Sequence, residues 1–275
     1  MVVTMCVVSG LHRTGRWPGG VPPLRCGRLA PMLAVACALL GEGALRPALG
    51  VMVTNPTTYW SPVAPLGDLV ADRQTGGDEV DLVGNAGTPS FYMAFDGGGT
   101  PLLTDGTLAF RARLAGEQTP AGFSSVLFVG MDADLNGDID LYLGVGQFGS
   151  KGLIEIFGPG SNTNVSPSTT SIAAYKPAQS YTLTASNYNW SPVTLSLDPT
   201  AATLDFGGTG GNDYFLSFAV PFADIVARLA TQGIAVTEDT SMRYVMATSM
   251  QGNALNADLN GVGKTYDDDA TWEDL

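Results

Sequence analysis

Beyond residue 50 the chain has no histidine and no cysteine, because its one histidine and three cysteines all lie in the first 50 residues. The Ser-His-Asp and Cys-His arrangements of hydrolases need a histidine as general base, so the rest of the chain cannot carry either of them. It also cannot form zinc sites built from histidine and cysteine. Without a disulfide to hold the fold, stability must come from burial and from bound ligands.

Positive charge is also scarce in this part of the chain. The whole sequence has a net charge of −13, and removing the first 50 residues leaves 25 acidic and 8 basic residues, a net charge of −17. Such a surface repels nucleic acid and anionic membranes, so we expect neither as a partner. It is compatible with surroundings that are rich in cations.

One apolar run near the N-terminus is too short to span a membrane. Residues 29–40 provide 12 apolar or small residues, whereas a membrane-spanning helix needs about 20. Arg25 and Arg28 precede the run and a small-residue stretch ending at Gly50 follows it, which is the order of a secretory signal. A lipid-attachment box ending at Cys37 is an alternative interpretation of the same run.

We therefore predict that residues 1–50 are a signal peptide and leader, and that the mature chain is secreted or held at the cell surface. The remaining residues, 51–275, are enough for one sizeable core, so we predict a single domain without a transmembrane span. The long basic region before the apolar run leaves the true start codon open.

The mature part is rich in glycine, threonine, serine and asparagine, and its apolar runs of four to eight residues are separated by turn signals. This pattern favours an all-β fold, an antiparallel β-sandwich or jelly roll. The candidate strands are 79–83, 90–95, 107–114, 126–131, 141–145, 153–157, 181–185, 193–197, 203–206, 214–220 and 243–249.

One short helix interrupts the strands. Apolar residues recur at helical spacing from Phe222 to Ala230, with Pro221 at the start and Gly233 beyond the end. The segment 158–171 has no periodicity and is predicted to be a long surface loop.

The most informative motif is the acidic stretch Asp132-Ala-Asp-Leu-Asn-Gly-Asp-Ile-Asp140. Oxygen side chains at its first, third, fifth and ninth positions, with a glycine at the sixth, are typical of a loop that closes around calcium. The predicted ligands are the side chains of Asp132, Asp134, Asn136 and Asp140, with the backbone carbonyl of Asp138.

The motif is not a complete EF-hand, because Leu143 stands where that motif has its bidentate glutamate. It resembles the shorter acidic loops of extracellular β-proteins, and its apolar flanks predict a calcium-type loop in a β-hairpin. A solvated acidic turn without metal is the alternative.

The pentapeptide at 133–137 recurs word for word at 257–261. In this second copy Asn256, Asp258 and Asn260 could supply oxygens, but the ninth position is Lys264, which cannot bind a cation. The acids 267–269 could substitute for it. The sequence favours a solvated acidic tail in the region 256–269 and leaves a second metal site as an alternative.

Four aromatic residues lie in polar segments and not in apolar runs: Tyr59, Trp60, Tyr188 and Trp190. Exposed aromatic faces stack on sugar rings, so these residues form a candidate carbohydrate platform. The alternative is that Trp60 and Trp190 cover sheet ends.

Three acids, Asp81, Glu155 and Asp205, lie between apolar neighbours in predicted strands, so alternation points them outward into solvent. A pair of such acids could catalyse glycoside hydrolysis, so a carboxylate-based polysaccharide hydrolase is an alternative function. Acids that point outward into solvent are, however, ordinary in a β-sandwich.

Several short segments scattered over residues 79–273 resemble a group of exported bacterial proteins, largely uncharacterised, many of which end in a Pro-Glu-Pro sorting tail. These segments are 81–84, 131–145, 156–160, 247–261 and 271–273. A weaker similarity, through 91–96 and 218–224, is to family-9-type carbohydrate-binding sandwiches. The sorting tail is not in this sequence, which leaves open whether the chain is truncated after Leu275 and whether a C-terminal anchor follows.

From the sequence we expect an exported, calcium-stabilised, non-catalytic protein that binds an extracellular glycan or matrix or builds the cell surface. The alternatives are the polysaccharide hydrolase and a purely structural protein that associates with itself.

Overall fold

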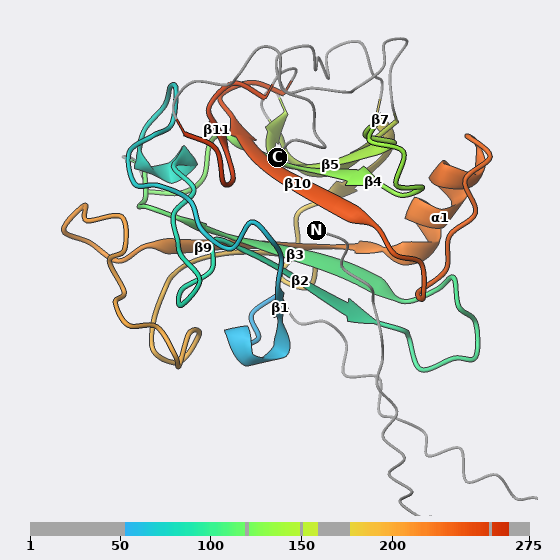
Figure 1. The fold of residues 1–275 in the computed structure, drawn as a ribbon, viewed down its shortest axis with the longest axis horizontal. Coiled ribbons are helices and arrows are strands. Elements are labelled where there is room, and N and C mark those ends of the chain that lie inside the picture. Colours follow the sequence, from blue (N-terminus) through green and yellow to red (C-terminus); the bar gives the residue numbers. More distant parts are fainter. Residues whose placement is uncertain (1–52, 119–120, 149–150, 159–176, 253–254, 264–275) are drawn as a thin grey trace, which may run out of the picture.

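The computed structural model describes residues 53–118, 121–148, 151–158, 177–252 and 255–263. They form two antiparallel sheets, one above the other in Figure 1, with one helix at one end. The prediction of an all-β sandwich is confirmed. Among these residues no helix is long and apolar enough to cross a membrane.

Each sheet has a defined strand order. The five-stranded sheet has the order β1 (Ser61–Pro62), β2 (Phe91–Asp96), β3 (Thr107–Leu114), β9 (Tyr214–Pro221) and β8 (Tyr188–Pro192). The six-stranded sheet has the order β11 (Asp258–Leu259), β10 (Arg243–Ser249), β4 (Val126–Asp132), β5 (Leu141–Phe148), β6 (Lys151–Phe157) and β7 (Pro177–Thr182). The helical elements are η1 (Thr57–Tyr59), η2 (Asp78–Val80) and α1 (Phe222–Ala230).

The main core lies between the two sheets, because alternate residues of each strand point into it. From the five-stranded sheet, β3 contributes Leu108 and Phe110. From the six-stranded sheet, β4 contributes Leu127, Val129 and Met131, all buried. One continuous apolar cluster therefore contains residues of both sheets and packs them against each other.

Helix α1 follows β9 directly and covers one end of the sandwich (Figure 1). Its buried residues Phe222, Ile225 and Leu229 share one face, as the helical spacing predicts, and join the main core. The chain leaves the helix through Gly233, whose φ of +83° favours glycine. The predicted helix is confirmed.

The outer face of the five-stranded sheet carries a second buried layer, which includes two arginines of β3. Arg111 donates to Ser217 Oγ at 2.7 Å and to the carbonyl of Val53 at 2.9 Å. Its guanidinium lies 4.3 Å from the centroid of the Trp60 ring, a cation–π contact. Burial lowers the pKa of Arg111 to about 10.

Arg113, two residues further along β3, forms ion pairs with two buried aspartates. Its guanidinium binds Asp213 at 3.0 Å and also binds Asp198. Asp213 accepts the backbone N–H of Phe206 and of Gly207, and burial raises its pKa. The alternation of β3 thus puts its arginines outside the main core, yet a further layer of chain removes them from solvent.

Three predicted strands are wrong. Residues 79–83 contain the end of η2 and one isolated bridge, from Leu82 to Leu114. Residues 193–197 form a turn in which Leu197 N–H donates to Thr194, and the strand β8 precedes them. Residues 203–206 form no strand, because the side chain of Asp205 closes a loop by accepting the N–H of Thr209 at 2.9 Å. The predicted leader 1–50 lies outside the described residues, as does the predicted loop from residue 159 onward.

Candidate metal centre

The acidic motif forms the turn between β4 and β5, which are antiparallel neighbours in the six-stranded sheet. Asp132 is the last residue of β4, and Asp140 directly precedes β5, where its N–H donates to the carbonyl of Met131 at 2.8 Å. Leu135 and Gly137 have φ values of +64° and +94°, which fold the chain back on itself. The predicted strands on either side of the motif are present, and they pair as a hairpin.

The turn brings three carboxylates together. Asp132, Asp134 and Asp140 each offer an oxygen, and these oxygens lie within 4.8 Å of one another. Asp132 and Asp140 are buried, whereas Asp134 is exposed. The cluster therefore has a closed side against the sheet and an open side toward solvent.

Backbone N–H groups of the turn hold these side chains in place. Asp132 accepts the N–H of Asn136 at 3.1 Å and of Gly137 at 3.2 Å through its two oxygens. Asp140 accepts the N–H of Ala133 at 2.8 Å. A carboxylate oxygen can accept more than one partner, so these bonds orient the cluster and leave room for a cation.

The electrostatics of the turn disfavour three bare charges. Burial raises the pKa of Asp140 to about 6; the N–H of Ala133 opposes this, and the charges of Asp134 and Asp132 add to it. Burial also raises the pKa of Asp132. The cation facing this residue is Arg243, whose nitrogen lies 3.9 Å from the Asp132 carboxylate, a long contact for an ion pair.

The other two predicted ligands, the side chain of Asn136 and the backbone carbonyl of Asp138, belong to the same turn. The side-chain oxygen of Asn136 accepts the N–H of Asp138 at 2.8 Å, so it shapes the turn. The donor set is oxygen only and acidic, which suits calcium better than a transition metal. The arrangement can hold a hard divalent cation with water completing its coordination.

The repeated pentapeptide at 257–261 has a different structure. Its Asp258 and Leu259 form β11, which pairs with β10. The side-chain oxygen of Asn256 accepts the hydroxyl of Ser249 at 2.8 Å, and that of Asn260 accepts the hydroxyl of Ser90 at 2.5 Å. Asp258 and Asn260 are only 2% and 5% exposed, so the favoured prediction of a solvated tail is wrong for these two residues, and the acids 267–269 lie outside the described residues.

Asp258 instead lies beside two acids that the sequence analysis missed, Asp68 and Asp72. Neither belongs to a motif, and their sequence neighbours give no metal-binding spacing. Contacts between distant segments bring them together with Asp258, among them the bond from the N–H of Gly261 to Asp68 and the pairing of β11 with β10.

The four aromatic residues do not form one platform. Trp60 is only 6% exposed and packs on the outer face of the five-stranded sheet, so its predicted exposure is wrong. Tyr188 and Trp190 are partly buried against the main core, on the other face of that sheet. Trp190 stacks on Tyr214 at 4.8 Å, and Tyr59 alone is well exposed, at 63%.

Two of the three acids considered for hydrolysis, Glu155 and Asp81, are buried, contrary to the sequence prediction, whereas Asp205 is partly exposed. Glu155 is 7% exposed and accepts the hydroxyl of Ser180 at 3.0 Å. Asp81 is 1% exposed and forms an ion pair with Arg73. These bonds give Glu155 and Asp81 structural roles, as the loop at 205–210 does for Asp205.

Comparison with protein-family models, with curated proteins and with solved structures found no match to this chain.

Proposed function

We propose that this protein is an exported, calcium-stabilised β-sandwich that acts outside the cell without catalysis, by binding or by building the surface. The observation that carries the proposal is the cluster of Asp132, Asp134 and Asp140 on the β4–β5 hairpin. The basic, apolar and small-residue order of the first 50 residues supports export.

The position of the hairpin explains how an ion would stabilise the fold. Strand β4 lies between β10 and β5, so its end is tied to both neighbours. Asp132 ends this strand and pairs in register with Arg243 of β10. An ion held by Asp132 and Asp140 would therefore fasten both strands of the hairpin at the middle of the six-stranded sheet.

The absence of catalysis rests on the chemistry of the side chains. The chain beyond residue 50 has no histidine and no cysteine. The acids that could replace them, Asp81, Glu155 and Asp205, are engaged in hydrogen bonds or ion pairs. A carbohydrate partner would have to be bound without the four-residue aromatic platform, since Trp60 is buried.

Calcium binding is tested by calorimetric titration of the purified, chelator-treated protein, together with its melting temperature. At free calcium 100 times the Kd, ligand linkage adds about 2.7 kcal/mol to the free energy of unfolding. For a chain of this size that corresponds to a rise in Tm of roughly 5–11 °C.

The variant Asp140→Asn removes one charge while its side-chain oxygen can still accept the N–H of Ala133. We expect it to lose calcium binding at the hairpin and most of the calcium-dependent rise in Tm. The matched control is Asp239→Asn, the same change at an exposed residue outside the cluster. Equal calcium responses in wild type and Asp140→Asn would refute the hairpin site.

The alternative functions predict different results. A hydrolase would release soluble sugars from a glycan panel and lose this activity in Glu155→Gln. A glycan-binding protein would give array signals without turnover. A structural surface protein would show calcium-dependent self-association in light scattering and no glycan signal.

A further inference from the structure

The carboxylates of Asp68, Asp72 and Asp258, called here the Asp68 cluster, come from two distant parts of the chain. Asp258 belongs to the edge strand β11, and the other two lie between β1 and η2. Each residue offers an oxygen, and the three oxygens lie within 4.8 Å of one another. Their exposed fractions are only 5%, 5% and 2%, so the whole cluster is buried.

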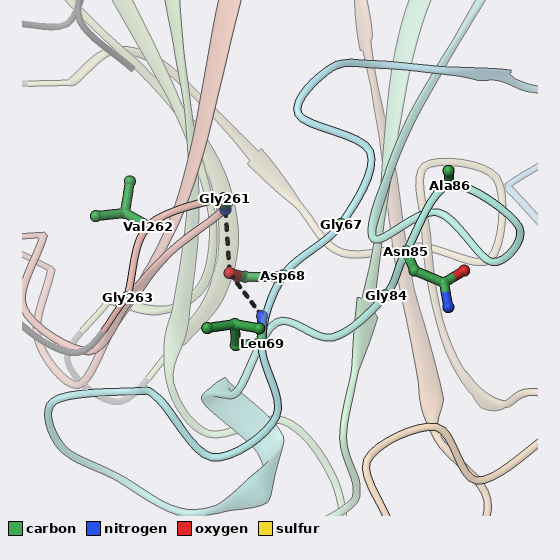
Figure 2. A pocket seen from close by; sticks show the side chains of 9 residues that line it. All are labelled: Gly67, Asp68, Leu69, Gly84, Asn85, Ala86, Gly261, Val262 and Gly263. Carbon is green, nitrogen blue, oxygen red and sulfur yellow. Dashed lines mark hydrogen bonds between the residues drawn. The ribbon is translucent and has the colours of Figure 1, made fainter.

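Two of these carboxylates are held firmly by the backbone. One oxygen of Asp68 accepts the N–H of Leu69 and of Gly261, both at 3.1 Å, as Figure 2 shows. Asp258 accepts the N–H of Leu82 at 2.6 Å. Gly261 has a φ of +86°, and a Cβ there would lie 2.3 Å from the ring of Pro65, so this close approach requires glycine.

The second oxygen of Asp68, Oδ2, is buried and accepts no hydrogen bond. A buried carboxylate oxygen without a partner is costly and rare in folded proteins. Among the described residues no ion pair joins Asp68 or Asp258 to a cation. Arg73 forms ion pairs with Asp78 and Asp81.

Burial, followed by the charges of Asp258 and Asp72, raises the pKa of Asp68 to about 9. Burial also raises the pKa of Asp258 to about 7. Protonation would relieve the repulsion, because a protonated carboxyl could donate to a neighbouring carboxylate oxygen, including the unpartnered Oδ2 of Asp68. A divalent cation relieves the repulsion and gives this oxygen a partner.

We propose that Asp68, Asp72 and Asp258 bind a second calcium ion, independently of the hairpin site. The donors are all oxygens, as calcium prefers, and calcium takes six to eight of them. A pocket of 410 Å³ reaches Asp68 between Gly67, Gly84 and Gly261 (Figure 2).

This ion would have a structural role different from that of the hairpin ion. The chain after Asp68 is joined to the five-stranded sheet, where the N–H of Val83 donates to the carbonyl of Arg113 at 3.1 Å. Asp258 belongs to the six-stranded sheet. The ion would therefore join segments that lie 193 residues apart in sequence, as the Asp68–Gly261 bond already does, and would tie the two sheets together.

The first experiment counts calcium ions by calorimetric titration of four proteins. We expect two ions in wild type, one in Asp134→Asn/Asp140→Asn, one in Asp68→Asn and none in the combined variant. Loss of all binding in the hairpin variant, with one ion retained by both wild type and Asp68→Asn, would overturn the second site and leave the proposed function standing. The reverse pattern would remove the hairpin site and keep the Asp68 cluster.

The second experiment uses the melting temperature, because Asp68→Asn keeps the oxygen that accepts Leu69 and Gly261. In chelator, this variant loses a like-charge repulsion, so we expect a higher Tm than wild type. In saturating calcium it lacks a ligand, so we expect a lower Tm, and Asp72→Asn should behave alike. A higher Tm under both conditions would mean that the three carboxyl groups share protons and bind no calcium, and would overturn the proposal. For the exposed control Asp239→Asn, the difference in Tm from wild type should have the same sign in chelator and in calcium.

Discussion

The buried ion pairs of Arg113 predict a large loss of stability when the arginine is replaced. The perturbation is Arg113→Met, which keeps much of the side-chain volume and removes the charge. Arg113 and Asp213 are fully buried and Asp198 is 2% exposed, so both carboxylates would stay in the interior without their cation. Breaking a buried pair by removing one partner costs about 3–5 kcal/mol.

The lower end of this range applies here. Asp213 keeps its bonds from Phe206 and Gly207, and Asp198 keeps the hydroxyl of Thr57 at 3.0 Å. We therefore expect a loss of about 3 kcal/mol in the free energy of unfolding. For a chain of this size, the corresponding fall in Tm is roughly 6–12 °C.

Arg111→Met is the matched control, because Arg111 is on the same strand, the same face and equally buried. Arg111 donates hydrogen bonds to Ser217 and to the carbonyl of Val53, which are neutral, so replacing it does not take the ion-pair partner from a buried carboxylate. We expect a cost of about 1–2 kcal/mol for this control. Both variants are compared by urea unfolding, followed by tryptophan fluorescence and circular dichroism. A loss of stability in Arg113→Met no greater than that in Arg111→Met would refute the reasoning. So would a triple variant, Arg113→Met with Asp198→Asn and Asp213→Asn, that is no more stable than Arg113→Met alone.

Three further predictions concern other parts of the fold. Leu229→Ala removes a fully buried side chain of α1 and should cost about 2–5 kcal/mol in urea unfolding, whereas the same measurement on the exposed Ala230→Ser should show little change. Gly261→Ala should lower the Tm in calcium and in chelator alike, because the added Cβ would meet Pro65 and the φ of +86° disfavours alanine; an unchanged Tm would contradict the close approach. In calcium-free buffer, stability should rise as the pH falls from 9 toward 5, because the pKa values of Asp68 and Asp258 are raised to about 9 and about 7 in the folded state, which therefore binds protons more tightly than the unfolded chain. This contribution to stability is present at low pH and is lost as the pH rises through those values. A free energy of unfolding that increases as the pH rises from 5 to 9 would show that the carboxylates are not buried together.

Local pattern was sufficient to predict the elements whose residues alternate or repeat clearly. Strands β3 and β10 have the predicted bounds, and α1 follows the apolar spacing from Phe222 to Ala230. The acidic turn was also predictable, because its acidic residues are close in sequence and its flanking strands are strongly apolar. In each of these cases the interactions that decide the structure lie within about ten residues.

The remaining features depend on contacts between distant segments. The burial of Arg111 and Arg113 requires chain from residues 53–60 and 198–213 to cover the outer face of the sheet. The segment 257–261 has the same sequence as 133–137, yet it pairs with β10 because of its position after that strand. Asp68 and Asp72 carry no local signal, since their partner Asp258 is near the other end of the described chain.

The strand order has a consequence for how copies of this protein can associate. Two of the four sheet edges, β1 and β11, are only two residues long. The other edges, β7 and β8, are six and five residues long, and each has a proline at one end, Pro177 and Pro192. Short and proline-bearing edges resist the addition of a strand from another molecule. Among the described strands, continuous sheets that run from copy to copy are therefore disfavoured, and we expect an assembly to form through side chains and bridging cations, which a chelator would dissolve.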